Sequence, residues 1–256
     1  MRSSGALSRI LNFLCLVGFF LFALQACVHV PSRKGVPCKG DPGVYRRALS
    51  KLAETYKGLS GTVKVRVESK EGKVSFTGDL YAASPDKLHL DVFGFLHRPR
   101  FVLIKSGETI AWRDFDSGRS YVGPLARCPG FPANFPVSPL FLRDFIRILF
   151  LNFPGPLAVR APEGTDDPCR FTLTCRWGSF EVTMDPGVAL PVLVVGPKGE
   201  KFPFRLTFSD YAEVSSLVVP RRYGISVRDV HMTFDFRTLK VNPAFPPGVF
   251  VPRLPR

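Results

Sequence analysis

Large apolar residues recur at every second position in many short segments of this chain, and this two-residue period constrains the fold more than any other feature. Val63, Val65 and Val67, for example, alternate with three charged residues. Successive side chains of a β-strand point to opposite faces of a sheet, so the alternation predicts strands with one buried face. Similar segments, separated by turn signals, continue to residue 236. Together they predict an antiparallel meander of about ten or eleven strands.

Two other segments carry apolar residues at helical spacing. The first begins after Asp41 and Pro42, which suit the N-cap and the first helical position, and ends before Gly58. The second begins near Pro139 and runs to about residue 151, before Pro154 and the glycine after it stop the helix. The sequence therefore predicts a mainly β domain with helices, of the α+β class.

The predicted strands present more apolar surface than two helices can cover, since 24 of the 256 residues are phenylalanine. One solution is a sandwich of two sheets packed face to face around a dry core. The other is a single strongly curved antiparallel sheet, an open half-barrel covered by two or three helices, with an apolar cavity for lipid chains. The pattern alone favours neither. The candidates for lining this cavity or the core are Val65, Phe76, Leu90, Phe101, Trp112, Phe180, Phe204 and Phe234.

The amino-terminal segment has the composition of an export signal. Arg2 and Arg9 precede an uncharged apolar run that ends at residue 26, immediately before Cys27. Residues 24–27, Leu-Gln-Ala-Cys, resemble the lipobox of bacterial lipoprotein signals, which implies removal of residues 1–26 and acylation of Cys27. Residues 27–43 then form a flexible tether, and residues 44–256 form one domain. A membrane-spanning anchor and cleavage before an unmodified cysteine are the alternatives.

Four further cysteines follow the acylation candidate, namely Cys38, Cys128, Cys169 and Cys175. An even number in an oxidising compartment predicts two disulfides, with three alternative pairings. If residues 170–174 form one strand, Cys169 and Cys175 lie about 20 Å apart. A disulfide requires α-carbons within about 7 Å, so these two cysteines should not pair with each other. Unpaired, buried cysteines are the alternative.

The chain carries none of the motifs HExxH, CxxC, GxSxG or GxxxxGK[ST]. We therefore expect no enzymatic activity, no cofactor and no bound metal. The formal net charge of +14 favours contact with anionic surfaces. Because the basic residues are scattered over alternating strand positions, the sequence indicates lipid head groups or acidic partners rather than nucleic acid.

Several segments resemble the LolB-like outer-membrane lipoprotein receptors, which belong to the LolA/LolB lipoprotein-carrier fold. They are LHLDVFGFLHRPRFVL at residues 88–103, Ile-Ala-Trp at 110–112, LRDFIRILFLNFPG at 142–155 and Val-Asn-Pro at 241–243. The resemblance implies an amino-terminal helix before the meander and a second helix that covers the sheet. It also implies an apolar loop that protrudes between two early strands.

On this resemblance, Phe95 and Leu96 lie where the family carries the exposed apolar residue that helps to insert cargo into the membrane. A loop folded back onto the sheet is the alternative. The resemblance further implies a monomeric receptor, lipid-anchored at the periplasmic face of the outer membrane, that takes acylated lipoproteins from a soluble LolA-like periplasmic carrier. A carrier of another lipid or glycolipid, or a non-catalytic envelope interaction module, are the alternative functions.

Overall fold

The computed structural model describes residues 41–254, except residue 71 and residues 132–140, 162–168 and 197–203. The predicted signal, Cys27, Cys38 and most of the predicted tether therefore lie outside the described residues. Among those described, no helix combines the length and the hydropathy needed to cross a membrane.

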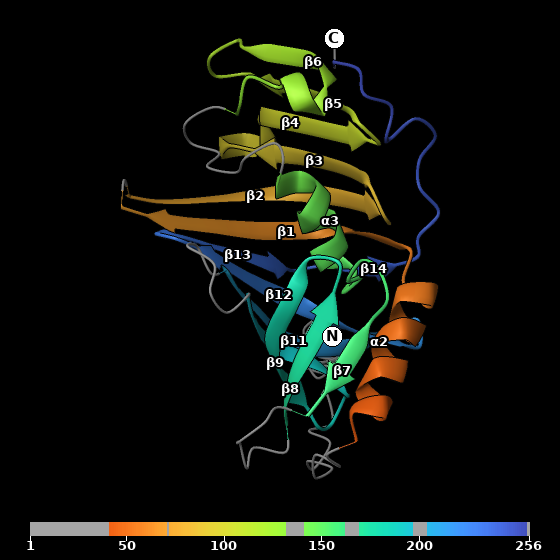
Figure 1. Cartoon of the computed structure of the whole chain (residues 1–256). Coiled ribbons are helices and arrows are strands. Elements are labelled where there is room, and N and C mark those ends of the chain that lie inside the picture. The colour runs from red at the N-terminus through yellow and green to blue at the C-terminus, as the bar shows by residue number, and fades with distance from the viewer. Residues whose placement is uncertain (1–40, 71, 132–140, 162–168, 197–203, 255–256) are drawn as a thin grey trace, which may run out of the picture. The chain divides into compact units, whose positions relative to one another are not determined.

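The described strands form a single antiparallel sheet (Figure 1). Its order is β6-β5-β4-β3-β2-β1-β13-β12-β11-β10-β9-β8-β7, and β14 also pairs with β1. Every neighbour along this path follows in the chain except at the β1–β13 junction. The strands are β1 (Gly58–Ser69), β2 (Gly72–Ala83), β3 (Lys87–Phe93), β4 (Pro99–Ser106), β5 (Thr109–Asp114), β6 (Ser120–Pro124), β7 (Ala158–Arg160), β8 (Arg170–Cys175), β9 (Gly178–Asp185), β10 (Leu190–Val195), β11 (Phe204–Val214), β12 (Leu217–Val227), β13 (Val230–Phe236) and β14 (Lys240–Val241).

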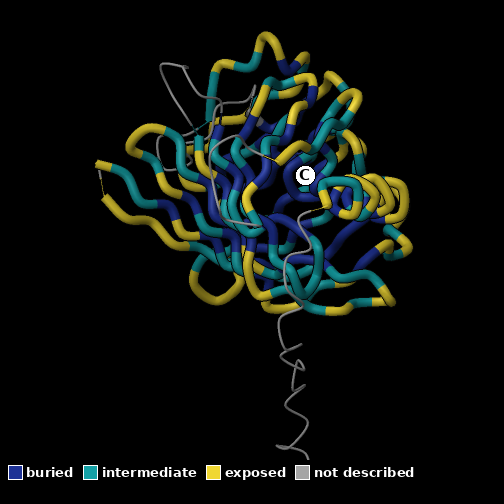
Figure 2. Tube along the Cα trace, turned by 60° about the horizontal axis from the view of Figure 1, so that its bottom comes forward, coloured by how far each residue is buried: buried dark blue, intermediate teal, exposed yellow. Residues whose placement is uncertain are grey.

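The predicted alternation is confirmed along the centre of the sheet. Val63, Val65 and Val67 of β1 are buried, whereas Arg66 between them is exposed. Val65 pairs directly with Phe234 across the β1–β13 junction, so both strands bury the same face. Figure 2 shows the buried residues gathered in the interior and the exposed ones at the hairpin turns.

The strong curvature of a half-barrel is not observed, which corrects that part of the prediction. The sheet is not strongly curled, and β6 and β7 form its two edges. Instead, the strands change direction along the sheet: in Figure 1, β2 to β4 are nearly horizontal, whereas β7 and β8 are steeply inclined. The right-handed twist between neighbouring strands accumulates in this way over a wide sheet. Alternation specifies which face of a strand is buried but not how the sheet bends.

The sheet also has more strands than predicted. All fourteen described strands belong to one sheet rather than to the two sheets of a sandwich. Two of those not predicted are β7, with three residues, and β14, with two. Segments of that length are too short to display a two-residue period.

Two α-helices accompany the described sheet, α2 (Pro42–Thr55) and α3 (Phe141–Leu149), with short 3-10 helices at η1 (Phe95–His97) and η2 (Leu125–Arg127). The predicted N-cap of α2 is confirmed, because the Asp41 carboxylate accepts a 2.8 Å hydrogen bond from the amide of Gly43. Helix α2 lies beside β7 and β10, and its Tyr45 ring contacts Phe171 at 4.7 Å between centroids.

Helix α3 crosses one face of the sheet in Figure 1. Phe145 packs on Phe234 of β13, with 4.7 Å between the ring centroids. At the end of the helix, the buried Tyr223 hydroxyl on β12 donates a 3.1 Å hydrogen bond to the carbonyl of Leu149. Burial raises the pKa of Tyr223 well above its ordinary value, so this hydroxyl stays a donor at neutral pH. The helix is thus fixed to β12 at a defined height above the sheet.

We expect a Tyr223→Phe variant to unfold with a free energy lower by about 1–2 kcal/mol, because the buried Leu149 carbonyl loses its hydrogen-bond partner. Urea unfolding followed by circular dichroism measures this change. Tyr121→Phe is the matched control, since the Tyr121 hydroxyl donates to the Pro124 carbonyl in an exposed setting. Equal effects of the two substitutions would show that Tyr223 does not anchor α3.

The carboxyl-terminal residues 242–254 are held against one end of the first strands. The Asn242 side chain accepts hydrogen bonds from the amides of Lys57 and Gly58, at 2.8 and 2.9 Å. Further on, the Nδ1 of His89 on β3 lies 2.7 Å from the Val249 carbonyl, and its Nε2 lies 3.0 Å from Asp91. His89 therefore links the carboxyl-terminal segment to the sheet.

His89 should make this link dependent on pH. Burial lowers the pKa of His89, but the Asp91 carboxylate and the Val249 carbonyl outweigh it and leave the pKa raised above 6.5. Protonated His89 therefore adds stability that is complete below the unfolded pKa and disappears as the pH rises through the folded one. We expect His89→Gln to reduce the loss of unfolding free energy between pH 6 and 8, as measured by urea titration. His231→Gln is the control, because the His231 ring bonds Ser226 and Thr233 and not the carboxyl-terminal segment. An unchanged pH dependence in His89→Gln would contradict this role.

Candidate functional site

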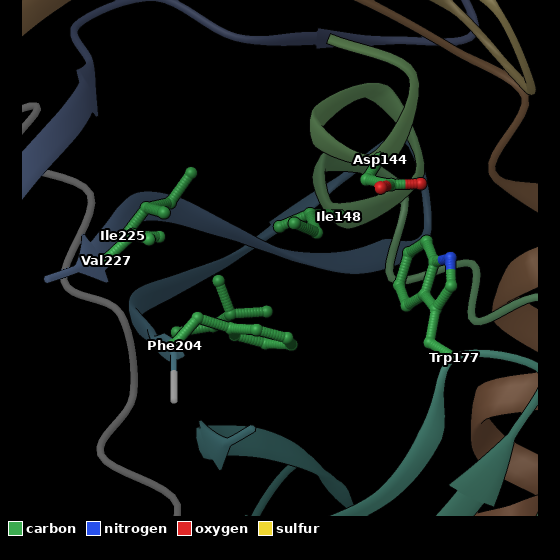
Figure 3. Close-up of a pocket in the computed structure, with 7 residues that line it drawn as sticks. Asp144, Ile148, Trp177, Phe204, Ile225 and Val227 are labelled. Carbon is green, nitrogen blue, oxygen red and sulfur yellow. The ribbon is translucent and has the colours of Figure 1, made fainter. Parts of the chain in front are cut away.

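A pocket of about 260 Å³ lies between α3 and the sheet (Figure 3). Its roof comes from α3, its floor from β11 and β12, and one wall from the turn between β8 and β9. The lining residues are Asp144, Ile148, Trp177, Phe204, Leu206, Ile225 and Val227.

The floor of the pocket follows from strand pairing. Phe204 lies opposite Val227, and Leu206 lies opposite Ile225, in the β11–β12 register. Residues two apart on a strand share a face, so these two pairs form a continuous apolar surface. Above them, Asp144 and Ile148 are four residues apart on α3, a spacing that places both on one side of a helix.

Asp144 gives the pocket polarity at one side. In Figure 3 its carboxylate and the Trp177 ring lie together, on the side away from Ile225 and Val227. Trp177 also packs edge-on against Phe153, with 6.2 Å between ring centroids, which fixes the position of the indole. The pocket can thus hold an apolar chain at one end and a polar group near Asp144 at the other.

Of the eight predicted lining residues, Phe204 lines this pocket. The others belong to the apolar core or pack against it: Val65, Leu90, Phe101, Trp112, Phe180 and Phe234 are buried, and Phe76 is partly buried. Phe180 lies next to the pocket, with its ring 5.5 Å from that of Phe204. Sequence reasoning missed the other six lining residues, which are Asp144, Ile148, Trp177, Leu206, Ile225 and Val227. The spacing of the first two on a predicted helix was a usable signal, whereas a tryptophan in a turn was not.

The predicted apolar loop is exposed. Phe95 retains 86% and Leu96 73% of its accessible surface, although both are large and apolar. We call residues 94–98 the β3–β4 tip. Its ends are closed by a 2.8 Å hydrogen bond from the Gly94 amide to the Arg98 carbonyl, and the His97 ring stacks on Phe93.

The backbone of the β3–β4 tip is unusual. Leu96 and His97 have positive φ angles of 56° and 57°. Residues other than Gly, Asn and Asp rarely adopt this left-handed region, and backbone strain of this kind is concentrated at functional sites. The conformation turns the Phe95 and Leu96 side chains into solvent instead of against the sheet. The alternative of a loop folded back onto the sheet is therefore not what the structure shows.

Basic side chains accompany the tip. Arg98 and Arg100 are both exposed, and Arg100 is ion-paired with Asp116 in the turn between β5 and β6. The pairing raises the pKa of Arg100 further through the hydrogen bond and charge of Asp116, so Arg100 stays charged. Arginine beside exposed apolar residues is the combination that suits a phospholipid interface.

The cysteines differ from the prediction of two disulfides. Cys128 and Cys175 are free, whereas Cys169 is disulfide-bonded. Cys169 and Cys175 are not paired with each other, as the length of β8 between them predicted. Cys128 instead accepts a 3.4 Å hydrogen bond from the Trp112 indole, and burial raises the pKa of the Cys175 thiol. An even cysteine count therefore overestimated the number of bridges.

The described residues contain no group of three or more His, Cys, Asp or Glu side chains that could hold a metal ion. No family model matches the chain, and no curated protein matches it by sequence.

Several solved structures are similar to this chain in fold. A DUF1329 family protein from Desulfovibrio piger is similar with a TM-score of 0.59 and 10% identity, over 82% of this chain and 97% of the other. A domain named for outer membrane lipoprotein sorting, from Vibrio parahaemolyticus, gives 0.55 and 10%, over 84% and 97%. A LolA superfamily protein from Nitrosomonas europaea gives 0.52 and 12%, over 81% and 97%. At these identities the likeness concerns the fold.

Proposed function

We propose that this protein is an outer-membrane lipoprotein that receives acylated lipoproteins from a soluble LolA-like periplasmic carrier and inserts them into the bilayer. The observation that carries the proposal is the apolar pocket beneath α3, in a sheet of the LolA-superfamily-like fold. Acylated Cys27 would hold the body at the periplasmic face of the membrane, and the body would act as a monomer without cofactor or catalysis.

The pocket would bind an acyl chain of the cargo. At about 260 Å³ it is smaller than the roughly 300–1,000 Å³ typical of small-molecule sites, so we expect it to take one chain or part of one. The burial of each methylene contributes about 0.8 kcal/mol, so even a short stretch of chain is held firmly. The chain has no nucleotide-binding motif, and transfer would follow a gradient of affinity from carrier to receptor to bilayer.

The β3–β4 tip would perform the insertion step. Phe95 and Leu96 are exposed and can enter the acyl region of the bilayer, while Arg98 contacts the head groups. The left-handed backbone at Leu96 and His97 would keep the apolar side chains of the tip directed outward while the cargo moves.

Transfer of a radiolabelled lipoprotein tests this function. The full-length protein in outer-membrane-like vesicles should draw labelled cargo from a LolA-like carrier, and vesicles without the protein should not. Bound acyl chains without any transfer of lipoprotein would favour a carrier of another lipid or glycolipid. Neither bound lipid nor transfer would favour an envelope interaction module.

A further inference from the structure

The strand that leaves the β3–β4 tip is bonded to the turn that follows β5, which we call the β5–β6 turn (residues 115–119). The amide of Phe115 donates a 2.9 Å hydrogen bond to the carbonyl of Arg100, and the Arg100 guanidinium is ion-paired with Asp116. Alternate connections of an antiparallel meander lie at the same end of the sheet. The tip and this turn are therefore neighbours, and a surface that contacts one of them can contact the other.

The β5–β6 turn is also ordered by hydrogen bonds of its own. The carboxylate of Asp114, which is buried, accepts a 3.0 Å hydrogen bond from the amide of Asp116 and a 2.6 Å hydrogen bond from the hydroxyl of Ser117. The amide of Asp114 donates to the carbonyl of Arg119 at 2.9 Å. The turn therefore presents its side chains from a backbone that is fixed at both ends.

The tip and the turn together carry an excess of positive charge. Residues 94–100 and 113–119 contain four arginines and two aspartates, an excess of two positive charges. Both carboxylates are already engaged, since Asp114 bonds groups within the turn and Asp116 is paired with Arg100. The charge that these two segments offer to a partner is therefore positive.

Arg119 is the part of this charge that the proposed insertion step does not use. It is exposed, as is Arg98 of the tip. Its guanidinium lies 5.9 Å from the ring centroid of the buried Trp112, a distance that allows a cation–π contact. This contact with a core residue favours one position for the Arg119 side chain, two strands away from the tip.

The acyl pocket reaches the same end of the sheet. Val227 of its floor lies two residues before Asp229 in the β12–β13 turn, and Asp229 is ion-paired at 2.8 Å with Lys70 in the β1–β2 turn. The β1–β2 turn is another alternate connection of the meander, so it lies at the end that carries the tip. A cargo chain that leaves the pocket past Val227 is therefore on the side of the tip and the β5–β6 turn.

Exposed cations beside exposed apolar side chains suit a bilayer that contains anionic lipid. The apolar residues enter the acyl region, and each Lys or Arg near an anionic surface adds a favourable electrostatic contribution. A single inserted tip leaves the protein free to turn about it. A second cation at a separate position limits that rotation, and Arg119 supplies one.

We propose that the β5–β6 turn is a second membrane contact, in which Arg119 meets the head group of an anionic phospholipid while the β3–β4 tip enters the acyl region. This inference rests on the proposed function, because it names the lipid that the inserting end of the protein prefers. Insertion of the tip then depends on the anionic lipid content of the bilayer as well as on Phe95 and Leu96.

Quenching of a tryptophan introduced by Phe95→Trp measures how far the tip enters the bilayer. This full-length reporter protein is placed in nanodiscs with brominated acyl chains, with and without phosphatidylglycerol, and the signal of the two native tryptophans is subtracted. We expect phosphatidylglycerol to raise the ratio of inserted to free tip. At about 1 kcal/mol per arginine, Arg119 contributes on the order of fivefold to this ratio. Added salt should reduce the gain.

Arg119→Gln in the reporter protein should remove most of this contribution. Arg119→Lys should keep most of it, because the charge remains while the contact with the Trp112 ring changes. Arg237→Gln is the matched control, since Arg237 is also exposed but directly follows β13, at the opposite end of that strand from the β12–β13 turn. Circular dichroism of each variant verifies that the fold is retained.

No gain from phosphatidylglycerol, or an equal gain in Arg119→Gln, would overturn the second contact and leave insertion of the tip intact. Unchanged quenching in Arg119→Gln together with slower uptake of cargo from the carrier would assign Arg119 to a protein partner, and would also overturn it. Absence of quenching of the introduced tryptophan in every nanodisc would instead overturn the insertion step of the proposed function.

Discussion

A Val227→Trp variant should lose most of its acyl-chain binding while keeping its fold. Val227 is half-buried in the pocket floor, opposite Phe204, so we expect an indole at this position to occupy the pocket. Blocking several methylenes at about 0.8 kcal/mol each weakens binding by about tenfold or more. Competition with a fluorescent acyl probe, using the full-length protein in nanodiscs, measures the loss.

Val218→Trp on the same strand is the matched control. Val218 is also half-buried, but it lies opposite Glu213 and outside the pocket lining. We expect it to bind the probe as the unmodified protein does, with a similar circular dichroism spectrum. If Val227→Trp retained full binding, the acyl site would have to lie elsewhere in the protein.

Replacement of Leu96 with Glu should abolish the delivery of cargo into vesicles without preventing its uptake from the carrier. Transfer of a Leu side chain into an apolar medium contributes about 1.5–3 kcal/mol, and a carboxylate at that position opposes insertion instead. Because Leu96 is 73% exposed, the substitution removes little of its packing in the folded protein. Phe95→Glu should act in the same direction.

The measurement separates two steps, namely labelled lipoprotein bound to the receptor and labelled lipoprotein protected within the bilayer. Val122→Glu is the control, since Val122 is 49% exposed on the edge strand β6 and lies outside the β3–β4 tip. Normal insertion by Leu96→Glu would remove the β3–β4 tip from the mechanism.

Local signals predicted the elements of this fold well. The Asp41-Pro42 start of α2 and the alternation of Val63, Val65 and Val67 both depend on neighbours in the chain, and both are confirmed. The curvature of the sheet depends on how twist and side-chain packing combine over many strands, and the predicted half-barrel was wrong in that respect.

The site was harder to predict than the fold. Phe204 follows the same alternation as Phe180 and Phe234, yet it lines the pocket while they belong to the core. What distinguishes Phe204 is the position of α3, which lies over β11 and β12 at the pocket although these strands are distant from the helix in the sequence. The exposed residues of the tip, Phe95 and Leu96, were predicted from the resemblance to the LolB-like receptors and not from periodicity.

The junction between β1 and β13 has a consequence for how the chain reaches this structure. Every other pairing in the order joins consecutive strands. The β1–β13 pairing, which places Val63 opposite Phe236, cannot form until β13 has been synthesised. A polypeptide that is synthesised from its amino end can form β1 to β6 as successive hairpins. During this time one edge of β1 is unpaired and can pair with strands of other chains. During that interval a strand that is interior in the finished sheet is an exposed edge, and a chaperone that shields it would be needed most before synthesis is complete.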